Sequence, residues 1–114
     1  MFETTAAAEF KPYLATQECG NHPGIRWMTV TDRRGRGLKI STDTPMEASA
    51  LPYNAHELEN ARHPYDLPAV HHTYLRASLG QAGVGGDDSW GAPVFEEYTV
   101  KNEKKHFAFS FRGI

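Results

Sequence analysis

Alternating apolar and polar positions predict several short β-strands along this chain. Residues 25–31 are rich in β-branched and aromatic side chains, which favours a strand, and residues 38–42 alternate again after a loop with two glycines. A strand, a glycine-containing loop and a second strand together indicate a β-hairpin. Pro45 is expected to open a separate strand. The remaining predicted strands cover residues 46–50, 70–79, 95–100 and 106–112.

The last of these predicted strands carries phenylalanine at alternate positions. Phe107, Phe109 and Phe111 are each two residues apart. Side chains at this spacing lie on one face of a strand. The three rings are therefore predicted to pack together into the hydrophobic core.

One segment predicts a short helix, over residues 55–61. Asn54 can cap it, and Glu57 stands three residues later, as a capping box requires. Pro64 is expected to end it. Seven prolines and ten glycines break up helices elsewhere. The pattern therefore predicts an all-β fold, an antiparallel β-sandwich with one short helix.

Length and composition indicate an ordinary single domain over residues 1–114. A chain of 114 residues leaves no room for a second independent core. The formal net charge of -2 gives no electrostatic reason to expect nucleic acid or an anionic membrane as a partner. The sequence contains no apolar run of about 18 residues and no basic, apolar leader at its start. We therefore expect a cytoplasmic protein.

The histidines do not form a metal-binding pattern. His56 and Glu57 begin like the helix of a zinc protease, but Asn60 stands where the second histidine is required. His71 and His72 are adjacent, so in a strand they would point to opposite faces. We expect no metal site and no cofactor within this chain.

Other candidate patterns favour structural roles. The single cysteine, Cys19, excludes an internal disulfide, and it lacks the base and orienting group of a nucleophile. The glycine-rich residues 80–86 have neither the spacing nor the following helix of a dinucleotide-binding loop. The arginines in residues 33–36 indicate a solvated turn. The carboxylates at 57 and 59, and at 96 and 97, point in different directions, so neither pair suits acid–base catalysis.

The most informative segment for function is a glycine–aspartate turn that ends in tryptophan. It comprises Gly85, Gly86, Asp87, Asp88, Ser89 and Trp90. The glycines let the backbone turn tightly, and the aspartates and serine offer acceptors that can tie the turn together. An aromatic ring held on such a turn can stack on the C–H face of a sugar. Equally, Trp90 could simply cap the core.

Several segments, in order, resemble the region near the C-terminus of large bacterial β-galactosidases of glycoside hydrolase family 2. The strongest is Gly-Val-Gly-Gly-Asp-Asp-Ser-Trp-Gly at residues 83–91. The others are residues 12–13, 17–21, 26–27, 32–38, 50–53 and 56–63. The resemblance runs from Pro12 to the end of the chain, so residues 1–11 are expected to form an N-terminal extension.

The resemblance implies a fold and a role. The fold would be the C-terminal part of an antiparallel supersandwich related to galactose mutarotases. The two catalytic glutamates of the family lie in a TIM barrel and act by double displacement, and no residue here matches either one. Trp90 would lie at the rim of the galactoside site, near the glucose end of lactose, presented by residues 85–89. The isolated chain is therefore expected to be inactive.

The resemblance also implies partners and cofactors. The partners would be the rest of the β-galactosidase chain, or its large subunit, and a galactoside substrate. Enzymes of this family use magnesium and sodium, which the resemblance implies for the parent enzyme. A piece that lacks the preceding strands should expose unpaired strand edges and one apolar face.

Two alternatives differ from the β-galactosidase hypothesis. A stand-alone carbohydrate-binding or mutarotase-like module would bind galactosides unaided. An assembly module would use exposed strand edges to form a homo-oligomer. Sugar binding by the isolated chain favours the first alternative, and tight self-association without sugar binding favours the second.

Overall fold

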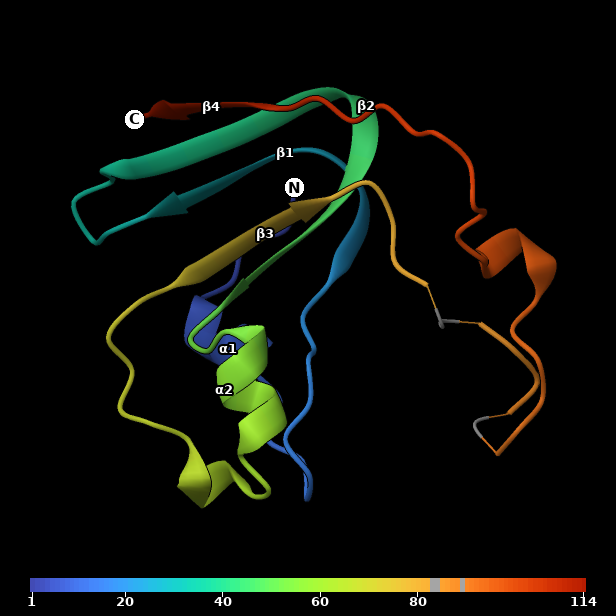
Figure 1. Ribbon diagram of the computed structural model, residues 1–114. Coiled ribbons are helices and arrows are strands. Elements are labelled where there is room, and N and C mark those ends of the chain that lie inside the picture. Colours follow the sequence, from blue (N-terminus) through green and yellow to red (C-terminus); the bar gives the residue numbers. More distant parts are fainter. Residues whose placement is uncertain (83–84, 89) are drawn as a thin grey trace. The chain divides into compact units, whose positions relative to one another are not determined.

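The computed structural model describes residues 1–82, 85–88 and 90–114. In chain order, its elements are α1 (Ala6–Glu9), β1 (His22–Thr31), β2 (Gly37–Leu51), α2 (Ala55–Asn60), the 3₁₀ helix η1 (Pro64–Asp66), β3 (Tyr74–Ser78), the 3₁₀ helix η2 (Glu96–Tyr98) and β4 (Ser110–Gly113) (Figure 1). An antiparallel sheet with a few short helices confirms the predicted all-β class. No helix in the described ranges is long and apolar enough to cross a membrane.

The β1–β2 hairpin forms where the sequence predicts it, and Asp32 organises its turn. The Asp32 N–H donates to the carbonyl of Arg36 at 2.8 Å. The Asp32 carboxylate accepts from the backbone N–H groups of Arg34 and Arg36 at 2.8 and 3.0 Å. These two backbone bonds, together with the Arg36 side chain, lower the pKa of Asp32. Gly35 adopts φ +78°, a conformation that glycine reaches without strain.

Strand β2 is longer than the sequence predicts. A separate strand beginning at Pro45 was expected, and this expectation is wrong, because β2 runs without interruption from Gly37 to Leu51. Proline removes one backbone donor, yet its fixed φ is compatible with an extended chain. Pro45 is also exposed, so it does not have to fit into a packed core.

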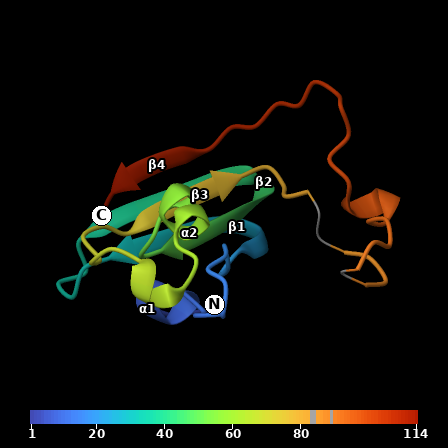
Figure 2. The same ribbon diagram turned by 60° about the horizontal axis from the view of Figure 1, so that its bottom comes forward.

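The four strands form one sheet in the order β1-β2-β3, and β4 also pairs with β2 (Figure 2). The β2–β4 pair is antiparallel, with Leu38 opposite Gly113, Lys39 opposite Arg112, Ile40 opposite Phe111 and Ser41 opposite Ser110. Strand β2 is therefore the common partner of the other strands.

The chain contacts divide into two compact units. The first comprises Met1–His22 and Ala48–Ala77, and the second comprises Pro23–Glu47 and Ser78–Ile114. The first unit holds the buried residues Ala48, Ser49, Leu51, Leu58 and Ala61, and the second holds Ile40 and Met46. Each unit thus has only a few fully buried side chains among the described residues.

Helix α2 begins as predicted. The Asn54 side chain accepts from the N–H of Glu57 at 2.8 Å, and the Glu57 carboxylate accepts from the N–H of Asn54 at 2.8 Å. This is the expected capping box. Leu58 is the buried residue of this helix, and the Thr16 hydroxyl donates to its carbonyl at 2.5 Å.

The predicted strand over residues 95–100 is wrong. This stretch forms η2, in which the N–H of Tyr98 donates to the carbonyl of Phe95 at 2.9 Å and the N–H of Thr99 donates to the carbonyl of Glu96 at 3.1 Å. The Thr99 hydroxyl also donates to the Glu96 carbonyl, at 2.7 Å. Local bonds between residues three apart satisfy the backbone here, in place of a ladder to another strand.

The two other predicted strands are shorter than expected, and one predicted core is absent. Within residues 70–79, only Tyr74–Ser78 forms a strand, which is β3. Within residues 106–112, only residues 110–112 lie in a strand, as part of β4 (Ser110–Gly113). Phe109 is 48% exposed and Phe111 is 70% exposed, so the prediction that these rings pack into the core is wrong. Phe107 is half-buried, and its ring lies 5.6 Å from that of Phe109, so these two rings contact each other without forming a buried core.

Candidate functional site

The loop that carries Trp90 closes at its base. In the second unit, the carbonyl of Gly85 accepts from the N–H of Phe95 at 3.1 Å. Gly85 has φ +99°, in the region that favours glycine. We call residues 85–88 and 90–95 the Trp90 loop, because this bond joins Gly85 to Phe95.

The Asp88 carboxylate forms hydrogen bonds to the backbone inside the Trp90 loop. Its Oδ1 atom accepts from the N–H of Trp90 at 2.7 Å and from the N–H of Ala92 at 3.2 Å. These two bonds are the main cause of a lowered pKa at Asp88, because they favour the charged carboxylate. A single ionised side chain thus fixes the backbone on both sides of Gly91, which has φ +137°. The sequence predicted acceptors in this turn without distinguishing Asp88 from its neighbours.

The Trp90 side chain lies on the surface. It is 93% exposed, so it does not cap the core. A large aromatic ring on a backbone tied by Asp88 is available to stack on a ligand. Its role in sugar binding stays a prediction.

The other residues predicted for the turn have different positions. Gly86 is close to the chain on the opposite side of the loop: a Cβ placed there would lie 3.4 Å from the carbonyl oxygen of Pro93. Asp87 is exposed to solvent. Ser89 lies outside the described residues.

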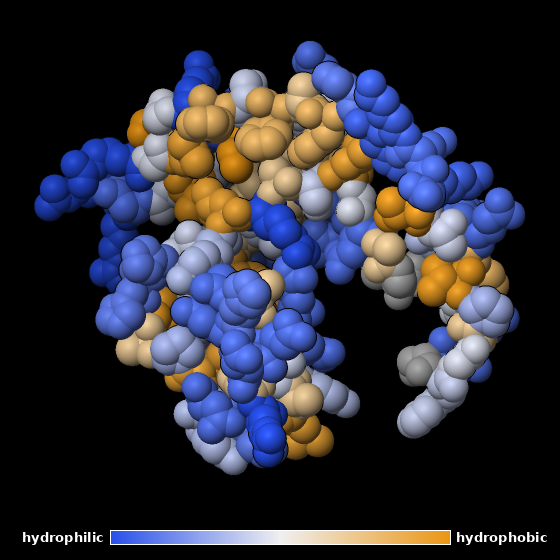
Figure 3. All heavy atoms as spheres, in the orientation of Figure 1, coloured by the Kyte–Doolittle hydropathy of each residue, from blue (hydrophilic) through white to orange (hydrophobic). Residues whose placement is uncertain are grey.

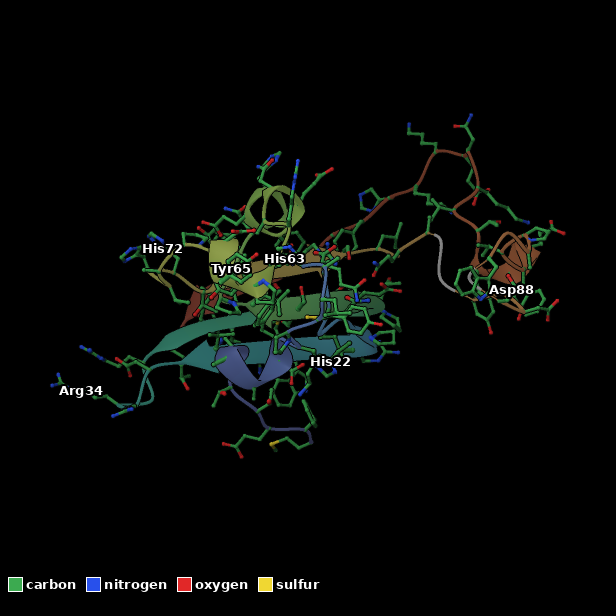
Figure 4. All side chains as sticks on the ribbon, turned by 90° about the horizontal axis from the view of Figure 1, so that it is seen from below. His22, Arg34, His63, Tyr65, His72 and Asp88 are labelled. Carbon is green, nitrogen blue, oxygen red and sulfur yellow. The ribbon has the colours of Figure 1, made fainter. Side chains whose placement is uncertain are left out.

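No metal centre is assembled in the described part of the chain. It contains no group of three or more His, Cys, Asp or Glu side chains that could hold a metal ion. Figure 4 shows His22, His63 and His72 on separate segments. His63 stacks on Tyr65 with ring centroids 5.0 Å apart.

Glu9 and His22 form an ion pair that no sequence motif predicts. In the first unit, Glu9 Oε2 lies 2.6 Å from His22 Nε2, and the ring of Phe2 lies 5.0 Å from the imidazole. The partners are 13 positions apart, and both belong to segments without a periodic pattern. Only tertiary structure brings them together.

Cys19 has a local structural environment. Its Sγ atom accepts from the N–H of Lys11 at 3.3 Å and lies 3.5 Å from the carbonyl of Glu9. The thiol therefore joins two backbone positions on either side of residue 10. This is compatible with the structural role predicted for it.

The first unit also has a shallow, mainly apolar depression. It is lined by Pro12, Tyr13, Leu14, His63, Pro64 and Tyr65. The His63 ring nitrogen Nδ1 lies 3.3 Å from the carbonyl of Leu14, which joins the two lining segments. None of these residues was predicted to contact a sugar.

Comparison with known proteins assigns the chain to a family. The family model described as "Beta galactosidase small chain" matches residues 1–112. A "Beta-galactosidase" of Halalkalibacterium halodurans is 43% identical over 99% of this chain, and "Beta-galactosidase BgaC" of Bifidobacterium adolescentis is 44% identical over 88% of it. A "Beta-galactosidase small subunit" of Latilactobacillus sakei is 40% identical over 86% of the chain.

The chain spans only part of each of these relatives. It covers 11% of the first, 10% of the second and 35% of the third. The family match nevertheless extends over almost all of the chain and includes residues 1–11. These matches confirm the resemblance noted in the sequence, and the chain belongs to the β-galactosidase small-chain family.

Proposed function

We propose that this chain is the C-terminal part of a β-galactosidase and that it shapes the galactoside site of the complete enzyme. The family match and the names of the relatives support this proposal. Retaining glycosidases use two carboxyl groups about 5 Å apart. No glutamate of this chain matches either one in the resemblance, so the catalytic pair belongs to the rest of the enzyme. Hydrolysis of terminal β-galactosides such as lactose is the reaction we propose for the whole.

The proposed role in sugar binding rests on one observation: the ring of Trp90 is exposed, and Asp88 holds the backbone that presents it. Its side chain is 93% exposed, and Asp88 accepts from the N–H groups of Trp90 and Ala92. An aromatic side chain on a restrained backbone has few torsions left to fix on binding, and its ring offers a flat apolar face to the C–H groups of a sugar. We propose that Trp90 stacks near the glucose end of lactose.

An open apolar face supports the proposal that the rest of the β-galactosidase is the partner. Phe109 and Phe111 are about half and two-thirds exposed on or next to β4. Figure 3, in the orientation of Figure 1, shows hydrophobic residues on the surface over β1, β2 and β4. A contiguous apolar surface next to an edge strand is typical of a face that another segment covers. The chain spans 35% of the small-subunit relative, so such a protein has further residues that are available to cover this apolar face.

The alternatives have less support. The named relatives are β-galactosidases, which does not favour a stand-alone carbohydrate-binding or mutarotase-like module. A homo-oligomer through β4 remains an outcome that sedimentation of the isolated chain would detect. A supersandwich around this chain, magnesium and sodium in the rest of the enzyme, and a cytoplasmic location are further parts of the proposal.

The decisive experiment replaces Trp90 within the complete β-galactosidase. Trp90→Ala should weaken substrate binding by on the order of 1–3 kcal/mol, the typical cost of removing an aromatic stacking partner. Tyr65→Ala is the matched control, because Tyr65 is also exposed, at 81%. Unchanged KM and kcat in the Trp90 variant would refute the stacking role.

Two measurements test whether the isolated chain hydrolyses or binds galactosides without the rest of the enzyme. The purified chain should not hydrolyse a chromogenic galactoside, and clear turnover would contradict the proposal. Calorimetry with lactose should give no binding heat. Binding by the chain alone would instead favour the stand-alone module.

A further inference from the structure

The base of the Trp90 loop is fastened by more than one contact. The Gly85 carbonyl accepts from the N–H of Phe95 at 3.1 Å, which closes the backbone. A second contact involves a side chain from beyond the loop: the ring of Tyr98 lies directly against Gly85. A Cβ at position 85 would lie only 2.8 Å from Cγ and Cε2 of that ring.

Gly85 is therefore constrained for two independent reasons. Its φ of +99° belongs to a region that side chains rarely adopt. The Tyr98 ring also occupies the space that a side chain would need. The ring thus packs on the backbone of the loop, at the position where the loop begins.

Contacts with neighbouring residues in the chain hold Tyr98 in position. Its N–H donates to the carbonyl of Phe95 at 2.9 Å, and the two rings lie with centroids 6.4 Å apart. The Thr99 hydroxyl and N–H both donate to the carbonyl of Glu96, at 2.7 and 3.1 Å. Helix η2 therefore orients the Tyr98 ring toward Gly85.

Two side chains thus hold the loop, one within it and one at its base. Asp88 holds the backbone around Trp90, and Tyr98 covers Gly85 at the base. Tyr98 is 49% exposed, so it contributes little to the core of the second unit.

We infer that Tyr98 is a positioning residue for Trp90: its ring, packed on Gly85, holds the loop so that Trp90 meets the sugar at the leaving-group end of a β-galactoside. The inference rests on the proposed function, because it assigns to Tyr98 a share in that same site. Tyr98 acts through the loop and need not touch the sugar.

The first test measures the motion of Trp90 in the full 114-residue chain. The chain has two tryptophans, so Trp27→Phe makes Trp90 the only tryptophan reporter. In that background, Tyr98→Ala should increase the nanosecond component of the fluorescence anisotropy decay, because the loop loses its base contact. Tyr98→Phe retains the ring and should leave the decay unchanged, as should the exposed control Tyr65→Ala.

The second test measures kinetics in the complete β-galactosidase. Tyr98→Ala should raise KM about two- to tenfold and change kcat little. The reason is that substrate binding must then immobilise Trp90, which the loop no longer positions beforehand. Tyr98→Phe should restore the KM of the parent enzyme. Trp90→Ala is measured in parallel and should have the larger effect.

The outcomes distinguish the positioning role of Tyr98 from the sugar-stacking role of Trp90. If Trp90→Ala raises KM but Tyr98→Ala changes neither KM nor the anisotropy decay, the positioning role is overturned and the Trp90 role stands. If Trp90→Ala leaves KM unchanged, the proposed function fails, and the positioning role in sugar binding fails with it. Should Tyr98→Ala not fold, Gly85→Ala provides the same test, since its added Cβ must displace the Tyr98 ring. Unchanged Trp90 motion in that variant would overturn the inference.

Discussion

The carboxylate of Glu9 lies 2.6 Å from Nε2 of His22, and this pair ties α1 to the first residue of β1. The Glu9 side chain is only 12% exposed, whereas that of His22 is 41% exposed. Burial alone would raise the pKa of Glu9, but hydrogen bonds from His22 and Thr4 and the charges of His22 and Lys11 outweigh it and lower that pKa. The pair thus couples the folding of the N-terminal segment to pH.

The Glu9–His22 pair predicts an acid-sensitive contribution to stability. Because the pKa of Glu9 is lower in the folded chain than its ordinary value of 4.5, its contribution is present above that value and is lost as pH falls through the folded pKa. The effect should be about 0.5 kcal/mol, since the pair is partly open to solvent. Urea unfolding of the wild type and Glu9→Gln at pH 7 and pH 3 measures it. The two proteins should differ at pH 7 and converge at pH 3; a constant difference would contradict the assignment.

The capping box predicts a loss of stability on removal of Asn54. Asn54→Ala leaves the N–H of Glu57 without its side-chain acceptor and should lower the free energy of unfolding by about 0.5–2 kcal/mol. Glu59→Ala is the matched control, because Glu59 is exposed on the same helix and makes no part of the cap. Denaturant unfolding should show a loss only for the first variant. Equal effects would indicate that general helix propensity dominates.

Local chemistry explains which elements the sequence predicts well. The β1–β2 hairpin and α2 depend on bonds between residues two to four apart, made by Asp32 in one case and by Asn54 with Glu57 in the other. Residue type and spacing are enough to recognise such bonds. The glycine–aspartate turn also belongs to this class, because the Asp88 bonds to Trp90 and Ala92 span two and four positions.

Elements that depend on distant partners were predicted less well. The strand predicted over residues 95–100 requires a partner strand, whereas this stretch forms the 3₁₀ helix η2, in which the carbonyls of Phe95 and Glu96 accept local hydrogen bonds. The pair of Glu9 and His22, and the contact of Tyr98 with Gly85, likewise leave no spacing pattern. These last two contacts are tertiary, and one sequence does not encode them as a motif.

Asp88 predicts a pH-dependent change in the Trp90 loop. Its pKa is lowered, so the carboxylate stays ionised and keeps its bonds well into mildly acidic solution, then releases them as pH falls through the lowered pKa. The backbone amide resonance of Trp90 should therefore titrate below the ordinary aspartate pKa of 3.8. Two-dimensional NMR of the chain measures this shift. Asp88→Asn should abolish the titration, and a midpoint at or above 3.8 would contradict the bonding.

Ile40 and Phe111 face each other across the β2–β4 pair, yet their environments differ sharply. Ile40 is 6% exposed and Phe111 is 70% exposed. In the isolated chain, Ile40→Ala should therefore lower the free energy of unfolding by about 2–4 kcal/mol, because it opens a cavity in the core. Phe111→Ala should change it by no more than about 0.5 kcal/mol.

The same two substitutions distinguish a core position from a surface that a partner covers. If the rest of the β-galactosidase covers β4, Phe111→Ala should weaken binding between this chain and the separately produced remainder of the enzyme, although the chain itself stays folded. Surface plasmon resonance with that remainder measures the affinity, and Tyr65→Ala is the exposed control. The expected loss is on the order of tenfold or more, as for a large aromatic residue at the centre of an interface. Unchanged binding of the Phe111 variant, with wild-type binding established, would exclude this face as the contact.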